Sequence, residues 1–395
     1  MESLVGRSQN VAAIIERKKK NKKAFFISAG IIILAAVLLG AIYNYYINIK
    51  YNGYKIEERS SIKNKNSASY ASYNDYILKY SKDGIVAMDA SGKELWNGSY
   101  DMASSAIDIC GEYVVVADVG EKNFIVYNGD DSGKEITTDY PIVQAEVSKQ
   151  GVVAVLLEES SSNVIRIYNP YDVQNKLLAE IPTNIDDGYP VSIDISDDGV
   201  NVAAVFVSVN DSKIQSRVAF YDFSDVGKNS NFLVGAQVYN DKLISEVKYL
   251  NDNDVFGEDG YCVWTNLRQP KVKFQKKYGT SIKSAFYNSK YIGVILDADD
   301  GNKNELEVFE LSGKRKLKIE LSEQYKQVQL NDNNEIMLNS DSKCVIYKMN
   351  GIKKFSSDIK GKVEYFYASG DNKCYYLILE NEIQKIKLKK IKKRG

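Results

Sequence analysis

Hydrophobic positions follow two different patterns along this chain of 395 residues. Residues 24–43 read AFFISAGIIILAAVLLGAIY, an uninterrupted apolar run without a charged side chain. Beyond about residue 50, short apolar segments alternate with turns rich in Asp, Asn, Ser and Gly. The first pattern predicts one long apolar helix, and the second predicts many short β-strands.

The stretch from Gly84 to Trp96, GIVAMDASGKELW, is the clearest unit of the second pattern. It reads as a strand that ends at Asp89, a tight turn around Gly92, and a second strand that closes on Trp96. Weaker copies of the strand end recur at steps of roughly 40 residues, with one step of roughly 50. The copies align on Asp89, Asn128, Asn169, Asp222, Asn266, Glu310, Lys348 and Lys387.

A period of this length, filled with short strands and turns, is typical of a β-propeller. Segments that begin each unit are expected to be innermost strands, for example 106–110, 143–147 and 191–195. Nearly continuous apolar segments follow them, as strands covered on both faces require, at 113–117, 152–157, 202–207 and 291–296. A two-sheet sandwich is the alternative all-β fold, but so many near-equal units exceed what one sandwich holds.

We therefore predict an all-β fold, a β-propeller of eight four-stranded blades that follows one transmembrane helix. The last unit, around residues 383–390, lacks an outer strand, and segment 54–58 has the alternation needed to supply it. A ring closed by strands from both ends of the chain has no open sheet edge. Seven blades are the alternative if the two terminal units merge.

The apolar run is long enough to span the roughly 30 Å hydrocarbon core of a bilayer as a helix. Basic residues at 17–23 precede it, and tyrosines follow at 43, 45 and 46. Because positive residues stay on the cytoplasmic side, we expect a cytoplasmic tail at 1–23, a transmembrane helix at 24–47 and an extracytoplasmic propeller at 48–395. A cleaved signal peptide is the alternative, but its apolar core would be shorter and a small-residue cleavage site would follow.

The amino-acid composition excludes several classes of catalytic and metal-binding site. The chain has no histidine, which excludes His-based general acid–base catalysis and His-containing metal sites. Its 52 basic residues balance its 52 acidic residues, so charge gives no argument for a nucleic-acid partner. The four cysteines are widely scattered, which favours ordinary buried thiols, although spacing leaves one bridge open.

The stretch Gly84–Trp96 resembles the repeat of the quinoprotein (PQQ-like) propeller superfamily, in which the closing Trp packs between blades. That resemblance implies blade-docking roles for Asp89, Gly92 and Trp96. The whole layout, a basic N-terminus, one span and a divergent propeller, resembles uncharacterised membrane-anchored β-propeller proteins of Gram-positive bacteria. Neither the vicinal cysteine pair nor the calcium ligands of quinoprotein dehydrogenases can be recognised, so we expect no cofactor.

Three groups of side chains are candidate sites. Tyr365, Tyr367 and Tyr375 crowd the last unit and form a candidate interaction surface, although tyrosines are also good strand formers. Asp108, Glu146 and Asp194 fall on expected innermost strands and are candidates to line the central channel; one acid per blade is also ordinary channel lining. The acidic segment 297–305 is an imperfect calcium loop, which we interpret as a solvated turn.

These observations favour a non-enzymatic, single-pass protein of the cell membrane. Its propeller would bind envelope proteins or wall polymers as a scaffold or assembly factor, and the basic tail at 391–394 could contact anionic lipids. No catalytic or metal-binding residue is assigned. The alternative is a small-molecule or cation sensor, or a hydrolase that uses carboxylates in the propeller channel.

Overall fold

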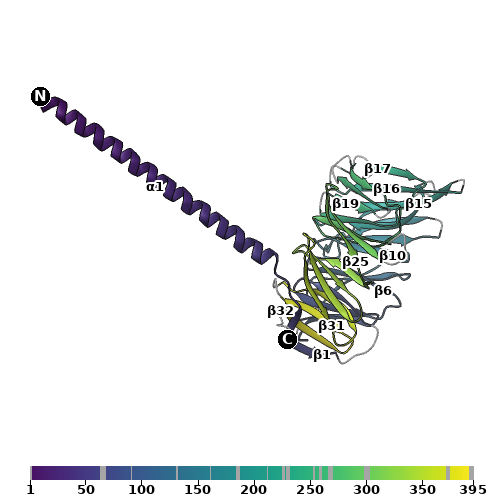
Figure 1. Cartoon of the computed structure of the whole chain (residues 1–395). Coiled ribbons are helices and arrows are strands. Elements are labelled where there is room, and N and C mark those ends of the chain that lie inside the picture. The colour runs from purple at the N-terminus through teal and green to yellow at the C-terminus, as the bar shows by residue number, and fades with distance from the viewer. Residues whose placement is uncertain are drawn as a thin grey trace. The chain divides into compact units, whose positions relative to one another are not determined.

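The computed structural model describes the chain except for residue 1 and fourteen short segments. The segments outside the description are 63–67, 90, 130–131, 161, 184–186, 211, 225–226, 228–231, 252–253, 258–259, 266–269, 298–302, 371–373 and 391–395. The chain divides into two units, Met1–Lys50 and Tyr51–Gly395. The first unit is helical and the second consists of strands (Figure 1).

Helix α1 (Glu2–Ile47) contains the predicted apolar segment and also the basic residues before it. The sequence therefore predicted the apolar part correctly but not that the helix begins at Glu2. Residues Ile27–Ile47 are long and apolar enough to cross a membrane, a property that an N-terminal signal sequence shares.

The described strands of the second unit form eight four-stranded antiparallel sheets, which we number in chain order. Sheet 1 contains β2 (Ser69–Tyr73), β3 (Tyr76–Ser81), β4 (Gly84–Met88) and β5 (Glu94–Ser99). Sheet 2 contains β6 (Ser105–Cys110), β7 (Tyr113–Asp118), β8 (Asn123–Tyr127) and β9 (Lys134–Thr137). Sheet 3 contains β10 (Ile142–Val147), β11 (Val153–Glu158), β12 (Asn163–Tyr168) and β13 (Leu177–Pro182). Sheet 4 contains β14 (Tyr189–Ile195), β15 (Asn201–Asn210), β16 (Lys213–Asp222) and β17 (Leu233–Asn240).

The remaining sheets repeat the same order of strands. Sheet 5 contains β18 (Val247–Asn251), β19 (Asp254–Gly257), β20 (Tyr261–Thr265) and β21 (Lys271–Lys276). Sheet 6 contains β22 (Ile282–Tyr287), β23 (Tyr291–Leu296), β24 (Asn304–Glu310) and β25 (Arg315–Leu321). Sheet 7 contains β26 (Gln327–Leu330), β27 (Glu335–Asn339), β28 (Lys343–Lys348) and β29 (Lys353–Asp358). Sheet 8 contains β30 (Val363–Ala368), β31 (Cys374–Leu379), β32 (Glu382–Lys389) and, from the other end of the unit, β1 (Gly53–Ser61).

The first strand of each sheet is innermost, because the first strands of neighbouring sheets lie beside one another, as β6, β10, β14 and β18 do. Second strands are covered on both faces where neighbouring sheets pack on them; Val114, Val115 and Val116 of β7, for example, are fully buried. The residues on which the repeats align follow or end the third strands, with two exceptions. Lys387 lies inside β32, and Asn266 lies outside the described residues.

Eight buried apolar clusters close the ring. Each cluster joins the facing sides of two neighbouring sheets, and the last one packs Ile77 of sheet 1 against Tyr367, Tyr376 and Ile378 of sheet 8. Because every sheet buries both faces in this way, no face is left without a neighbour. The closed arrangement confirms the predicted propeller architecture.

The ring is closed by a strand from the start of the unit. β1 pairs antiparallel with β32, with Tyr54 opposite Leu388 and Ile56 opposite Ile386, and Figure 1 shows β1 beside these C-terminal strands. This pairing confirms the prediction that segment 54–58 supplies the missing outer strand. The two terminal units form separate sheets, sheet 1 and sheet 8. The basic tail at 391–394 lies outside the described residues.

Candidate functional site

Asp89, Gly92 and Trp96 shape the turn and the outer strand of sheet 1. The Asp89 Oδ1 atom accepts hydrogen bonds from the N–H groups of Ser91 (2.9 Å) and Lys93 (3.0 Å). Burial alone would raise the pKa of Asp89, but a hydrogen bond from the Ser91 hydroxyl (2.7 Å), together with these backbone hydrogen bonds, lowers it below its usual value. Gly92 has a φ of +79°, which explains the glycine at this point of the turn.

Trp96 lies between two sheets and is 6% exposed. Its ring stacks on Tyr127 of sheet 2, with centroids 5.4 Å apart, and meets the edge of Tyr73 of sheet 1 at 5.6 Å. Both contacts belong to the cluster that joins these two sheets. The three residues thus belong to the turn and the outer strand of sheet 1, and Trp96 connects that sheet to sheet 2.

The predicted tyrosine surface is wrong, because two of its three members are buried. Tyr367 is 2% exposed and Tyr375 is 1% exposed, while Tyr365 is half-buried. The Tyr375 hydroxyl donates to Glu335 Oε2 (2.7 Å) and lies 2.7 Å from Lys354 Nζ. These aromatic rings fill the sheet interfaces on either side of sheet 8, as strand-forming tyrosines do, and offer little surface to a partner.

The innermost strands are braced by side chains that bond to the backbone of the next sheet. Asp108 Oδ2 accepts from the N–H of Val147 at 2.9 Å, and Asp194 Oδ2 accepts from the N–H of Tyr249 at 2.5 Å. Between them, the Gln144 amide exchanges two hydrogen bonds with the backbone of Ile193, both 3.0 Å. Asp108 and Asp194, two of the three predicted channel acids, therefore satisfy backbone groups that inner strands of separate sheets cannot satisfy by pairing.

A buried ion cluster lies where these inner strands meet. Lys248 of β18 forms ion pairs with Glu146 of β10 and with Asp194 Oδ1 of β14 (3.1 Å). Burial raises the pKa of Asp194 to about 6, although Lys248 opposes the rise. Burial and repulsion from Asp108 raise the pKa of Glu146 well above its usual range. Burial lowers the pKa of Lys248, but the attraction of Asp194 and Glu146 outweighs it, so the pKa ends well above its usual value.

Lys248 is the member of this cluster that sequence reasoning missed. Its signal in the sequence is a lysine inside a short apolar strand, Val247-Lys248-Tyr249, which a buried counter-charge explains. The cluster holds its carboxylates against one ammonium group and against backbone N–H groups, which is a structural arrangement. In the described part of the chain, no group of three or more Cys, Asp and Glu side chains could hold a metal ion.

The acidic segment 297–305 is described only at its ends. Asp297 pairs with Lys283 at 2.6 Å, and Lys303 pairs with Glu320 at 3.2 Å. Residues 298–302, which would carry the calcium ligands, lie outside the described residues. Cys110, Cys262 and Cys344 are thiols, half-buried in the first case and buried in the other two.

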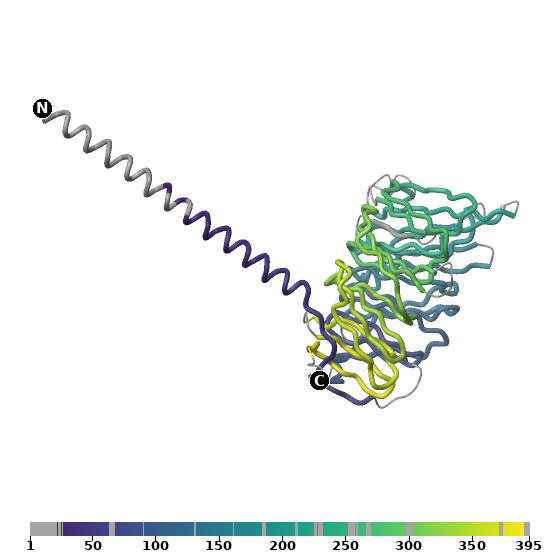
Figure 2. The backbone as a smooth tube through the Cα atoms, viewed as in Figure 1, coloured from purple at the N-terminus to yellow at the C-terminus, as the bar shows by residue number. Residues whose placement is uncertain are grey.

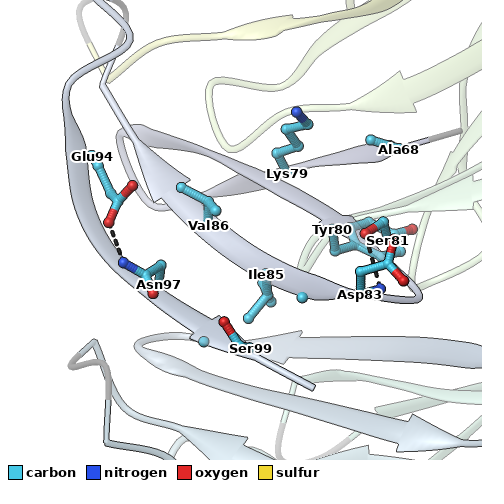
Figure 3. A pocket seen from close by; sticks show the side chains of 12 residues that line it. Ala68, Lys79, Tyr80, Ser81, Asp83, Ile85, Val86, Glu94, Asn97 and Ser99 are labelled. Atoms are coloured by element: carbon cyan, nitrogen blue, oxygen red, sulfur yellow. Dashed lines mark hydrogen bonds between the residues drawn. The ribbon is translucent and has the colours of Figure 1, made fainter. Parts of the chain in front are cut away.

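Two pockets involve residues of sheet 1. The first, about 280 Å³, lies along the face of sheet 1 and is lined by Lys79, Tyr80, Asp83, Glu94 and Asn97, among others. Figure 3 shows the Lys79 side chain at one end of it and the Asn97 amide bonded to Glu94 at the other. The second, about 320 Å³, is formed by turns of sheets 7, 8 and 1.

Sheet 4 carries an exposed apolar end. Its strands β15 and β16 are 10 residues long, whereas the neighbouring β19 and β20 of sheet 5 have 4 and 5. Figure 2 shows the corresponding teal hairpin reaching past its neighbours. Val209 and Ile214 face each other at this end and are 67% and 42% exposed, and Tyr189, opposite Val207, is 50% exposed. The extra length thus leaves apolar side chains that no neighbouring sheet covers.

The closed ring of four-stranded sheets defines a β-propeller protein whose central acids are structural. The chain belongs to a family of unknown function (DUF5711), whose sequence pattern matches residues 47–388. A comparison with curated proteins finds no matching sequence.

Solved propellers share the fold at low sequence identity. BamB from Moraxella catarrhalis is 10% identical with a TM-score of 0.51, over 86% of this chain and 99% of that one. Sqt1 from Chaetomium thermophilum, solved bound to the N-terminus of ribosomal protein L10, is 10% identical with a TM-score of 0.55, over 85% of this chain and all of that one. A eukaryotic initiation factor is 12% identical with a TM-score of 0.51, over 84% of each chain. At such identities these similarities establish the fold alone.

Proposed function

We propose that this protein is a non-enzymatic, single-pass membrane protein whose eight sheets form the eight blades of an extracytoplasmic binding propeller. Residues 1–23 would lie in the cytoplasm, 24–47 would span the membrane, and 48–395 would form the propeller. Its partners would be proteins of the cell envelope, which it would hold as a scaffold or assembly factor. Asp89, Gly92 and Trp96 would serve this role indirectly, by docking sheet 1 on sheet 2.

The apolar end of the β15–β16 hairpin carries this proposal. Exposed aliphatic and aromatic side chains at the end of a rigid element are the kind of surface that buries well against a protein partner. Propellers are also known as protein-binding folds, and Sqt1, solved with a segment of a ribosomal protein, is one example. The alternative function, a hydrolase in the channel, has less support than binding. Its candidate carboxylates already form an ion pair with Lys248 and accept hydrogen bonds from backbone N–H groups.

Crosslinking in whole cells tests both location and binding. Val209→Cys places a thiol on the hairpin, and Val173→Cys, at a position 94% exposed in the turn after β12, is the matched control. A membrane-impermeant thiol crosslinker should react with both variants, and only the hairpin variant should join a specific protein. Val209→Asp with Ile214→Asp should abolish that partner's co-purification.

Each part of the proposal can fail separately. If neither cysteine reacts from outside, the extracytoplasmic location is wrong. If both react but the hairpin variant captures nothing beyond the control, binding through the hairpin is wrong.

A further inference from the structure

The outer strands of sheets 5 and 6 are strongly basic. The outer strands of sheets 1 to 4 (β5, β9, β13 and β17) together contain one basic and three acidic side chains. By contrast, β21 and β25 together contain six basic side chains and one acidic side chain, which are Lys271, Lys273, Lys276, Arg315, Lys316, Lys318 and Glu320. The zero net charge of the whole chain therefore hides an uneven distribution of charge around the ring.

The sequence around β21 reinforces this excess. Residues 260–296 contain seven basic residues but no Asp or Glu, so any acid that neutralises β21 must come from elsewhere in the fold. Lys277 directly follows β21, Lys314 directly precedes β25, and both are exposed. We call the eight basic residues of segments 271–277 and 314–318 the basic rim.

Contacts between sheets 5 and 6 place the two halves of the basic rim side by side. At Gly313, a Cβ atom would lie 2.0 Å from the Phe274 ring, so the turn before β25 packs directly on β21. The Nζ atom of Lys276 on β21 lies 4.2 Å from the centroid of the Phe309 ring on β24. One bound molecule can therefore contact both outer strands at once.

A buried carboxylate holds three cations of the basic rim together. Glu307 of β24 pairs with Lys276 at 2.9 Å, with Arg315 at 3.3 Å and with Lys318 at 3.6 Å. Burial would raise the pKa of Glu307, but the hydrogen bond from Lys276 and the attraction of the three cations lower it below its usual value. Lys318 also pairs with Glu305 at 2.6 Å, which leaves three cations against two carboxylates. Because Arg315 and Lys318 carry five and three N–H donors and are about half exposed, donors remain for an anion from solvent.

This arrangement suits a flexible chain with repeated anionic groups. Alternate residues of a strand lie about 7 Å apart, so Lys271 and Lys273 are spaced for successive groups of a chain rather than for one small anion. The outer strands of successive sheets follow the circumference of the ring, a curved line that a flat membrane surface touches only in part. A single-stranded nucleic acid would gain from free aromatic faces for its bases, but Phe274 and Tyr278 pack in the cluster between sheets 5 and 6.

We propose that the basic rim binds a linear polyanion without bases, a polymer whose repeating unit carries a phosphate or a carboxylate group. Arg315 and Lys318, positioned by Glu307, bind one anionic group through charge-assisted hydrogen bonds. The exposed lysines of the basic rim bind further groups of the same chain. This inference goes beyond the proposed function and uses different residues, because the end of the β15–β16 hairpin contributes none of the basic rim.

Titration of the full chain in phosphatidylcholine nanodiscs with fluorescently labelled polyphosphate tests the inference. The rim variant combines Lys271→Gln, Lys277→Gln and Lys314→Gln, three exposed positions. At about 0.1 M salt it should bind polyphosphate about tenfold more weakly than the wild type. The slope of log K against log salt should also fall by about 2–3, roughly one for each lysine that contacts the chain.

The matched control combines Lys82→Gln, Lys122→Gln and Lys176→Gln, which removes the same charge from exposed positions between strands of sheets 1, 2 and 3. Both triple variants should melt with the wild type. Because the basic residues at 17–23 also attract anions, the test compares the two triple variants with each other. The control should keep both the affinity and the salt slope of the wild type.

Further probes identify the bound chain. Equal affinity for polygalacturonate assigns the basic rim to phosphate and carboxylate polymers alike, and weaker affinity assigns it to phosphate polymers. The inference is overturned if the rim variant binds polyphosphate as tightly as the control variant does. It is also overturned if single-stranded oligothymidylate binds more tightly than polyphosphate of equal charge, or if anionic-lipid vesicles displace polyphosphate at equal charge.

Discussion

Replacing Lys248 by methionine tests whether the central acids are held by one buried cation. Lys248→Met keeps most of the side-chain volume but leaves Glu146 and Asp194 without their shared counter-charge. Removing one partner of a buried ion pair destabilises a protein by about 3–5 kcal/mol. For a propeller of about 345 residues, an unfolding entropy of about 0.7 kcal/mol/K converts this loss into a melting temperature about 4–7 °C lower.

The pH dependence distinguishes an electrostatic loss from a packing loss. The pKa of Asp194 is raised to about 6 from an unfolded value near 3.8, so the folded state binds this proton more tightly. Its contribution to stability is fully present below pH 3.8 and is lost as the pH rises through about 6, by about 3 kcal/mol. Without Lys248 the carboxylates should protonate at still higher pH, which removes the uncompensated charge. The variant should therefore lose most stability near pH 8 and much less near pH 5.

Urea unfolding at both pH values measures this effect. The control is Lys303→Met, which breaks the exposed pair with Glu320 and should change the free energy of unfolding by less than about 1 kcal/mol. Adding Glu146→Gln to Lys248→Met should recover part of the lost stability, because it removes one of the unpaired charges. Equal losses at pH 5 and pH 8, or a loss no larger than that of the control, would refute the assignment of Lys248 as the counter-charge.

Two further predictions concern the ring itself. Trp96→Ala should lower the free energy of unfolding by about 3–5 kcal/mol, because it empties the space between Tyr73 and Tyr127. Trp96→Phe should lower it by clearly less. Equal losses in urea unfolding would show that the ring contacts do not matter. Deleting residues 51–62 removes β1 from sheet 8 and exposes the edge of β32. This deletion should sharply lower the melting temperature measured by circular dichroism. An unchanged melting temperature would contradict closure by β1.

Local patterns in the chain were enough to predict the repeat, the strands and the manner of closure. Period-2 alternation and a unit of roughly 40 residues are local signals, and a strand such as Val114–Ala117 can be covered on both faces only between two neighbouring sheets. The missing outer strand of the last unit could likewise be counted from the sequence, and segment 54–58 was the one piece left to fill it.

The roles of individual side chains depend on how neighbouring sheets pack, which the local patterns do not show. Tyr367 and Tyr375 read as surface aromatics but are buried, because strand alternation does not reveal how closely the next sheet packs. Lys248 and Glu146 are about a hundred residues apart, and the second pocket combines residues from the first and last sheets. Such groupings arise when a closed ring brings its innermost strands together, and no local pattern in the chain encodes that distance.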